Sequence, residues 1–194
     1  MNEEKKAKLL ELQKRATENG SDLSAIISEI LTTFDAELWP QAKRELGYEL
    51  NGFTDSAEYY SKPAREPHQH GYIPDRTMYY REREGRVVVA HADGARKDVG
   101  HDLAQRKHFF VSAPIKHLQE LAASADEEVA IEMPELSQLV GTKVVLLCAR
   151  TEVQQMVDVM RRSIGSVIHL LFNPDTWDKM DEHSRIKRER LNSP

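Results

Sequence analysis

The chain has 194 residues, of which 40% are hydrophobic and 30% charged, and its net charge is -5 at pH 7. This length and apolar content suffice for one domain with a buried core, and the acidic balance argues against broad, non-specific binding to nucleic acid. Apolar runs are too short to cross a bilayer and the charged start lacks a signal peptide, so we expect a cytoplasmic protein that does not bind membranes.

Helical periodicity dominates the first third of the chain. Residues 3–18 are expected to form a helix with Leu9 and Leu12 on one apolar stripe. If this stripe needs cover from another subunit, the chain forms a homo-oligomer. A second helix is expected from Leu23 to Phe34, with Ser21 or Asp22 as its N-cap.

A third helix is expected to follow, with Pro40 in its first turn and Asp35 as a candidate cap. Gly47 weakens it by about 1 kcal/mol relative to alanine, and close helix packing is one reason to keep such a residue. The helix should end at Asn51-Gly52 in a Schellman motif, in which Phe53 contacts Tyr48.

The middle of the chain is predicted to contain a long ordered loop and a small sheet. The polar segment 54–76 carries three prolines and reads as the loop. Residues 77–83 and 86–92 are predicted to form a β-hairpin around Glu84-Gly85. Phe109 to Val111 is expected to be a short strand, followed by a helix capped by Ser112.

The second half alternates short strands and helices. Residues 129–131 predict a strand, Pro134 to Gly141 a short helix, and residues 143–149 either a strand or the start of a helix. Cys148 in that last run is expected to be a small core residue. A long helix should begin with a capping box of Thr151 and Gln154 and end at Asn173-Pro174.

These elements predict an α+β fold with an N-terminal helical hairpin, a small antiparallel sheet and a long C-terminal helix. We expect a single domain over residues 1–174 and a charged tail over residues 175–194.

Common catalytic and nucleotide-binding motifs are absent from the sequence. Imidazole and carboxylate side chains in the middle of the chain nevertheless keep open a metal-dependent nuclease or hydrolase. The candidate ligands for such an enzyme are His68, His70, His91, Asp93 and His101. No standard metal-site spacing links them, so we expect no metal and no cofactor. His169, on the last helix, is expected to lie at the edge of the core.

Aromatic and basic residues alternate around the predicted hairpin. Side chains of this kind stack on bases or form hot spots for a protein partner, although a half-exposed hairpin gives the same pattern. The residues concerned are Tyr72, Arg76, Tyr79, Tyr80, Arg81 and Arg83. With the basic run from Arg185 to Arg190, they keep nucleic-acid binding open as an alternative function.

The sequence from Tyr48 to Phe53, followed by Ile73-Pro74-Asp75-Arg76, resembles the AbiTii-type abortive-infection family. The resemblance implies an opening helical pair, a β-containing middle, a long closing helix and a role in bacterial defence against phage. It implies no catalytic residues. Asp75 and Arg76 either brace the loop against the helix end or face a ligand.

The function we expect from these observations is a non-enzymatic, defence-associated interaction or effector module with a protein partner. The candidate residues for binding a ligand or partner are Asp75, Arg76, Tyr79 and Arg81. A metal-dependent hydrolase and a nucleic-acid-binding protein are the two alternatives.

Overall fold

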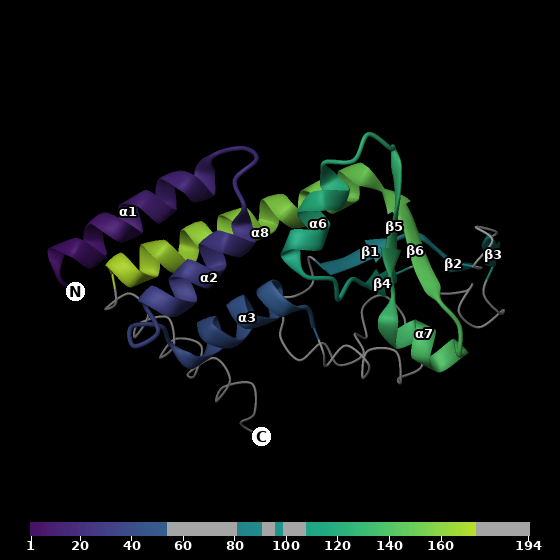
Figure 1. Cartoon of the computed structure of the whole chain (residues 1–194), viewed down its shortest axis with the longest axis horizontal. Coiled ribbons are helices and arrows are strands. Elements are labelled where there is room, and N and C mark those ends of the chain that lie inside the picture. The colour runs from purple at the N-terminus through teal and green to yellow at the C-terminus, as the bar shows by residue number, and fades with distance from the viewer. Residues whose placement is uncertain (54–80, 91–95, 99–107, 174–194) are drawn as a thin grey trace, which may run out of the picture. The chain divides into compact units, whose positions relative to one another are not determined.

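A computed structural model of the chain describes residues 1–53, 81–90, 96–98 and 108–173, without the side chains of residues 96–98 and 108. The fold is mixed α+β, as predicted, with N-terminal helices, small antiparallel sheets and a long C-terminal helix (Figure 1). Its elements are α1 (Glu3–Thr17), α2 (Leu23–Thr33), α3 (Pro40–Asn51), β1 (Glu82–Glu84), β2 (Arg86–Ala90), β3 (Arg96–Asp98), β4 (His108–Phe110), α6 (Ile115–Ala122), β5 (Glu128–Glu132), α7 (Pro134–Val140), β6 (Val144–Ala149) and α8 (Arg150–Phe172).

The chain divides into two compact units. The first comprises residues 1–44 and 161–194, and the second comprises residues 45–160. Helices α3 and α8 each contribute residues to both units.

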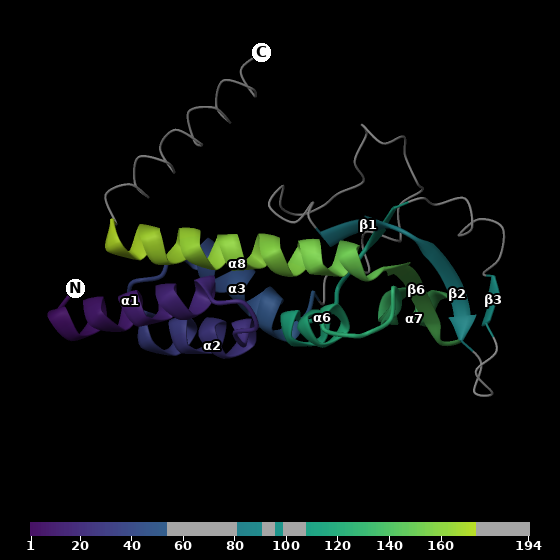
Figure 2. The ribbon, with the colours of Figure 1, turned by 90° about the horizontal axis from the view of Figure 1, so that it is seen from above.

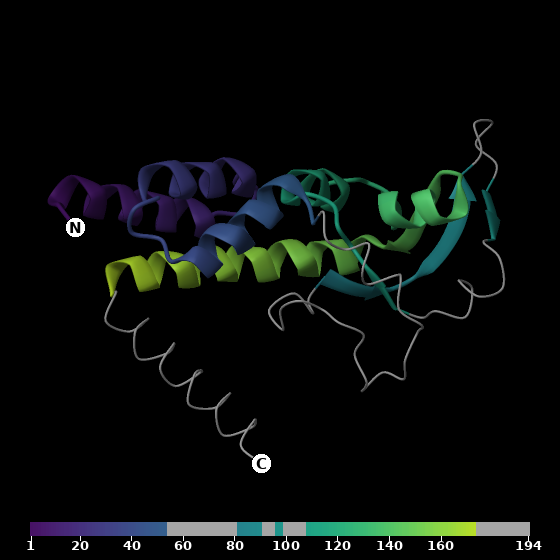
Figure 3. The same ribbon diagram turned by 90° about the horizontal axis from the view of Figure 1, so that it is seen from below.

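The first unit contains the predicted helical hairpin, in which α1 and α2 lie side by side (Figures 1 and 3). Asp22 caps α2, because its side chain accepts a hydrogen bond from the Ala25 amide at 3.0 Å. Leu9 and Leu12 are fully buried within the single chain. The apolar stripe of α1 is therefore already covered, and the reason for expecting a homo-oligomer is removed.

Polar contacts tie the two helices of the hairpin together. Glu29 on α2 accepts from both Lys8 and Arg15 on α1, with Nζ–Oε1 and Nη1–Oε2 distances of 2.5 and 2.6 Å. These two cations hold the pKa of Glu29 below its ordinary value. Arg161 on α8 donates to the carbonyls of Ala16 and Glu18, at 2.9 and 2.6 Å. Carbonyls at the end of α1 that lack helical partners are satisfied in this way.

Two expectations for α3 are wrong. The helix begins at Pro40, so Asp35 lies too early to cap it and instead forms an ion pair with Lys43 at 2.7 Å. Gly47 does not mark a close helix packing, because no atom of the described residues lies within 4 Å of a Cβ built on it.

The second unit contains a four-stranded antiparallel sheet with the order β3-β2-β6-β5 and a separate β1-β4 pair. Residues 144–149 thus form a strand, which is one of the two structures that the sequence allowed there. The predicted hairpin around Gly85 is wrong, since β1 pairs with β4 and β2 pairs with β6. β1 runs on into β2 across Gly85 (Figure 2). A Cβ at Gly85 would lie 2.6 Å from the Leu147 carbonyl oxygen, which leaves room only for glycine.

The helix starts of the second half differ from the predicted caps. Pro114, not Ser112, occupies the N-cap of α6 and makes no side-chain hydrogen bond there. Thr151 lies inside α8 rather than before it, and Gln154 donates to Asp158 at 2.9 Å, so the predicted capping box is wrong. The predicted helix α7 is confirmed, with Val140 as its last residue and Gly141, whose φ is 73°, as its C-cap.

None of the helices in the described part of the chain is both long and apolar enough to cross a membrane.

Candidate functional site

The end of α3 turns sharply onto the segment that precedes α6. The Gly52 amide donates to the Tyr48 carbonyl at 2.8 Å, and Gly52 has a φ of 88°. This single bond is the αL motif rather than the predicted Schellman motif, because the Phe53 amide donates to Ser112 instead, at 3.0 Å. The predicted contact of Phe53 with Tyr48 is confirmed, with ring centroids 5.2 Å apart.

Gly52 is required for a second reason besides its left-handed backbone. A Cβ at this position would lie 2.9 Å from the Ser112 carbonyl oxygen and 3.4 Å from Pro114 Cδ. The end of α3 is therefore in backbone contact with the 112–114 segment.

A buried ion pair fixes the same junction. Arg81 is fully buried, and its guanidinium donates to the Glu49 carboxylate and, at 2.9 Å, to the Ala113 carbonyl. It also lies over the Phe53 ring, with 5.1 Å between Cζ and the ring centroid. These contacts offset the loss of hydration that burial of a charge requires. Arg81, a candidate binding residue by sequence, thus braces the helix end from inside.

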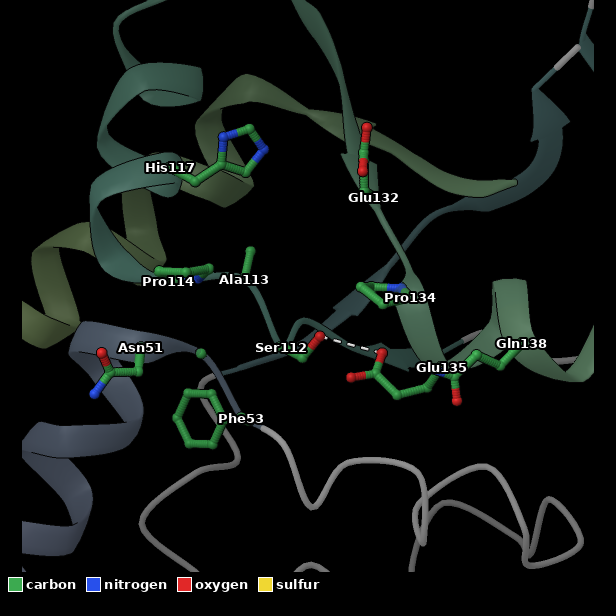
Figure 4. A pocket seen from close by; sticks show the side chains of 11 residues that line it. Asn51, Phe53, Ser112, Ala113, Pro114, His117, Glu132, Pro134, Glu135 and Gln138 are labelled. Carbon is green, nitrogen blue, oxygen red and sulfur yellow. Dashed lines mark hydrogen bonds between the residues drawn. The ribbon is translucent and has the colours of Figure 1, made fainter. Parts of the chain in front are cut away.

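An open groove of about 650 Å³ lies beside this junction (Figure 4). One wall is formed by the end of α3 and the 112–117 segment, and the other by the end of β5 and the start of α7. Its lining residues are Asn51, Gly52, Phe53, Ser112, Ala113, Pro114, His117, Glu132, Pro134, Glu135 and Gln138.

The groove combines apolar rings with carboxylates. Ser112 donates its hydroxyl to Glu135 at 3.2 Å, and only 6% of Ser112 is exposed. His117 lies 3.7 Å from Glu120, between Nδ1 and Oε2. The Ser112 hydroxyl therefore bonds to an acceptor carboxylate, an arrangement that braces the groove. Shape and negative charge are what the groove presents to a ligand.

Arg83, the other described arginine of the Tyr/Arg pattern, is also held by the protein. Its Nε lies 3.2 Å from Glu152 Oε2, and 11% of its side chain is exposed. Both residues line a second hollow of about 560 Å³, as does Cys148. Cys148 is 5% exposed, which confirms the predicted core position, and burial raises its pKa to about 11.

Many predicted site residues lie outside the described residues. They are Asp75, Arg76, Tyr79, the tyrosines Tyr72 and Tyr80, the candidate metal ligands His68, His70, His91, Asp93 and His101, and the basic run 185–190. Within the described ranges, no group of three or more potential ligands can hold a metal ion. His169 is exposed on α8, so its predicted place at the core edge is wrong.

Glu49, the partner of Arg81, is not among the site residues predicted from the sequence. A signal was present, because Glu49 follows Ala42 and Leu46 on the buried stripe of α3 at helical spacing. A carboxylate on such a stripe calls for a buried cation. Ser112, Glu132 and Glu135 had no comparable local signal, since they meet only in the folded chain.

No family model, no curated protein and no solved structure matches this chain.

Proposed function

We propose that this protein is a non-enzymatic binding module that recognises a protein partner through the groove beside the end of α3. The observation that carries the proposal is the braced groove itself. Buried contacts of Arg81 and Glu49 hold one of its walls, and its lining offers apolar rings and carboxylates to a ligand. Such a preformed, half-polar hollow suits recognition of another chain.

We propose bacterial defence against phage, in the cytosol, as the cellular role. This part rests on the resemblance of residues 48–53 and 73–76 to abortive-infection proteins. Gly52 and Phe53 from the first of these segments also line the groove, so the same residues support both parts of the proposal.

The test is phage infection of bacteria that express the chain from a plasmid. We expect wild type to lower plaque numbers and Gln138→Trp to lose this protection, because the exposed Gln138 lines the groove and tryptophan would fill it. Leu139→Trp is the matched control, since the neighbouring Leu139 on α7 is 63% exposed and is not part of the groove lining.

Two results would contradict the proposal. Full protection by Gln138→Trp would show that the groove is not needed for defence. If wild type gave no protection against a broad phage panel, the defence role would be wrong. Stoichiometric metal in the purified protein that is lost in His68→Ala/His70→Ala would favour the metal-dependent hydrolase instead.

A further inference from the structure

The β5 strand is an edge of the four-stranded sheet in the described part of the chain. The Met133 amide donates to the Val144 carbonyl at 3.0 Å, and the Arg150 amide to the Glu127 carbonyl at 2.8 Å. In an antiparallel pair, hydrogen-bonded residues alternate along the strand. Val129 and Ile131 therefore bond to β6, whereas the backbone groups of Ala130 and Glu132 point to the opposite edge.

That opposite edge opens toward the groove. Figure 1 shows β6 on one side of β5 and α6 on the other. Glu132, at the end of β5, and His117, on α6, line facing walls of the groove (Figure 4). No described residue forms a hydrogen bond with the outward backbone groups of Ala130 and Glu132. An added strand would lie about 4.8 Å from β5, on the side where the groove lies.

The side chains of β5 indicate which kind of strand can pair with its open edge. Glu128, Ala130 and Glu132 share one face of β5, and both glutamates are exposed. Glu135 adds a third carboxylate at the groove. A second copy of β5, paired antiparallel about Ala130, would put Glu128 opposite Glu132, and such like-charge pairs are destabilising. The charges thus oppose self-pairing and favour a basic strand.

We propose that β5 binds an extended basic segment of a protein partner by strand addition. Its cationic side chains stand four residues apart, opposite Glu128 and Glu132, with a small or apolar residue between them opposite Ala130. Backbone hydrogen bonds to Ala130 and Glu132 supply affinity, and the charges supply selectivity. This inference rests on the proposed binding function and names the class of partner.

The probes are two nine-residue peptides of valine and threonine with Lys at positions 3 and 7, or with Glu at both. Binding is followed by amide hydrogen exchange of the full-length chain, read by NMR. With the Lys peptide we expect slower exchange at Ala130 or Glu132 and little change at Val129 and Ile131, whose amides already bond to β6. The Glu peptide should bind about tenfold more weakly.

Charge variants sharpen the test. Glu132→Lys should weaken the binding of the Lys peptide about fivefold. Lys143→Ala should strengthen it, because Lys143 forms an exposed ion pair with Glu132 and competes with the peptide. Glu4→Lys is the control, because Glu4 is exposed on α1 and belongs to the other unit. Its affinity for the Lys peptide should equal that of wild type.

Other occupants would show different results, each of which overturns the proposal. Slow exchange at Ala130 and Glu132 that depends on protein concentration would identify a second copy. Slow exchange that disappears on deletion of residues 175–194 would identify the chain's own basic end. Equal binding of both peptides, or unchanged exchange at saturation, would refute strand addition. If phage protection still depends on Gln138 in that case, the proposed function stands without this inference.

Discussion

Gly20 and Gly52 share a left-handed backbone, with φ values of 82° and 88°, but their surroundings differ. No described atom lies within 4 Å of a Cβ at Gly20, whereas a Cβ at Gly52 would meet the Ser112 oxygen. Gly20→Ala should therefore lower the free energy of unfolding by about 1–2 kcal/mol, which is the backbone strain alone. Gly52→Ala should lower the free energy of unfolding by more, because the 112–114 segment must also shift. Urea unfolding measures both, and equal costs would contradict the close contact.

The Cys148 thiol should react slowly with alkylating reagents in the folded protein. Burial, and secondarily the charge of Glu152, raise its pKa to about 11, so at pH 8 it carries almost no thiolate, the reactive form. Alkylation by iodoacetamide at pH 8 should be much slower than for a free cysteine and should reach the free rate in denaturant. Rapid labelling of the native protein would contradict this pKa.

The same shift gives a pH dependence of stability. Because the folded-state pKa lies above the unfolded value of 9.0, Cys148 stabilises the fold below pH 9 and loses this contribution as pH rises through about 11. The free energy of unfolding of wild type should therefore fall faster over this pH range than that of Cys148→Ala. Parallel pH profiles for the two proteins would exclude the effect.

The Glu49–Arg81 ion pair decides how the end of α3 is held. Arg81→Met leaves the Glu49 carboxylate buried without this cation, which should cost about 3–5 kcal/mol of unfolding free energy. The double variant Glu49→Leu/Arg81→Met should recover much of that loss, because neither member of the pair is then left as a buried charge without the other. Chemical unfolding of the single and double variants gives the coupling between the two residues.

A surface pair supplies the control for this cycle. Glu3 and Lys6 form an exposed ion pair on α1 at 2.7 Å, and Lys6→Met should leave the free energy of unfolding almost unchanged, because solvent screens exposed pairs. Similar losses for Lys6→Met and Arg81→Met would mean that burial adds nothing to the Glu49–Arg81 pair.

The elements that the sequence predicted well are those with a local signal. Apolar spacing defined α1, α2 and the long helix α8, and Gly141 marked the end of α7. Strand pairing failed because it depends on distant segments. Nothing within residues 77–92 indicates that β1 pairs with residues 108–110 while β2 pairs with β6. The prediction of Ser112 as a helix cap is wrong because serine at the end of a loop suits either a helix start or, as here, a hydrogen bond to a distant carboxylate.

The groove could not be predicted either, because it forms only where segments that are distant in the sequence meet in the fold. Its lining comes from α3, the 112–117 segment, the end of β5 and α7, four stretches that share no motif or spacing. Of the candidate binding residues, only Arg81 is described near the groove, where it is buried against Glu49 and the Ala113 carbonyl. Residues marked by the resemblance, such as Gly52 and Phe53, lie at the groove because they shape the backbone there.

The boundary between the two compact units falls inside two continuous helices, after Arg44 in α3 and after Met160 in α8. Unfolding one unit alone would cut both helices and leave unpaired amides or carbonyls at each new end. We therefore expect the two units to unfold in one cooperative transition. The chain supplies its own probes, since Trp39 belongs to the first unit and Tyr48 to the second.

Leu12→Ala makes this expectation testable, because Leu12 is fully buried in the first unit and its truncation should cost about 2–5 kcal/mol. If unfolding is cooperative, the urea midpoints from tryptophan fluorescence and from tyrosine near-UV circular dichroism should fall together and by the same amount. A tyrosine midpoint that stays at the wild-type value while the tryptophan midpoint falls would mean that residues 45–160 unfold independently. Ile131→Ala, at an equally buried position in the second unit, provides the reciprocal measurement and should likewise lower both midpoints.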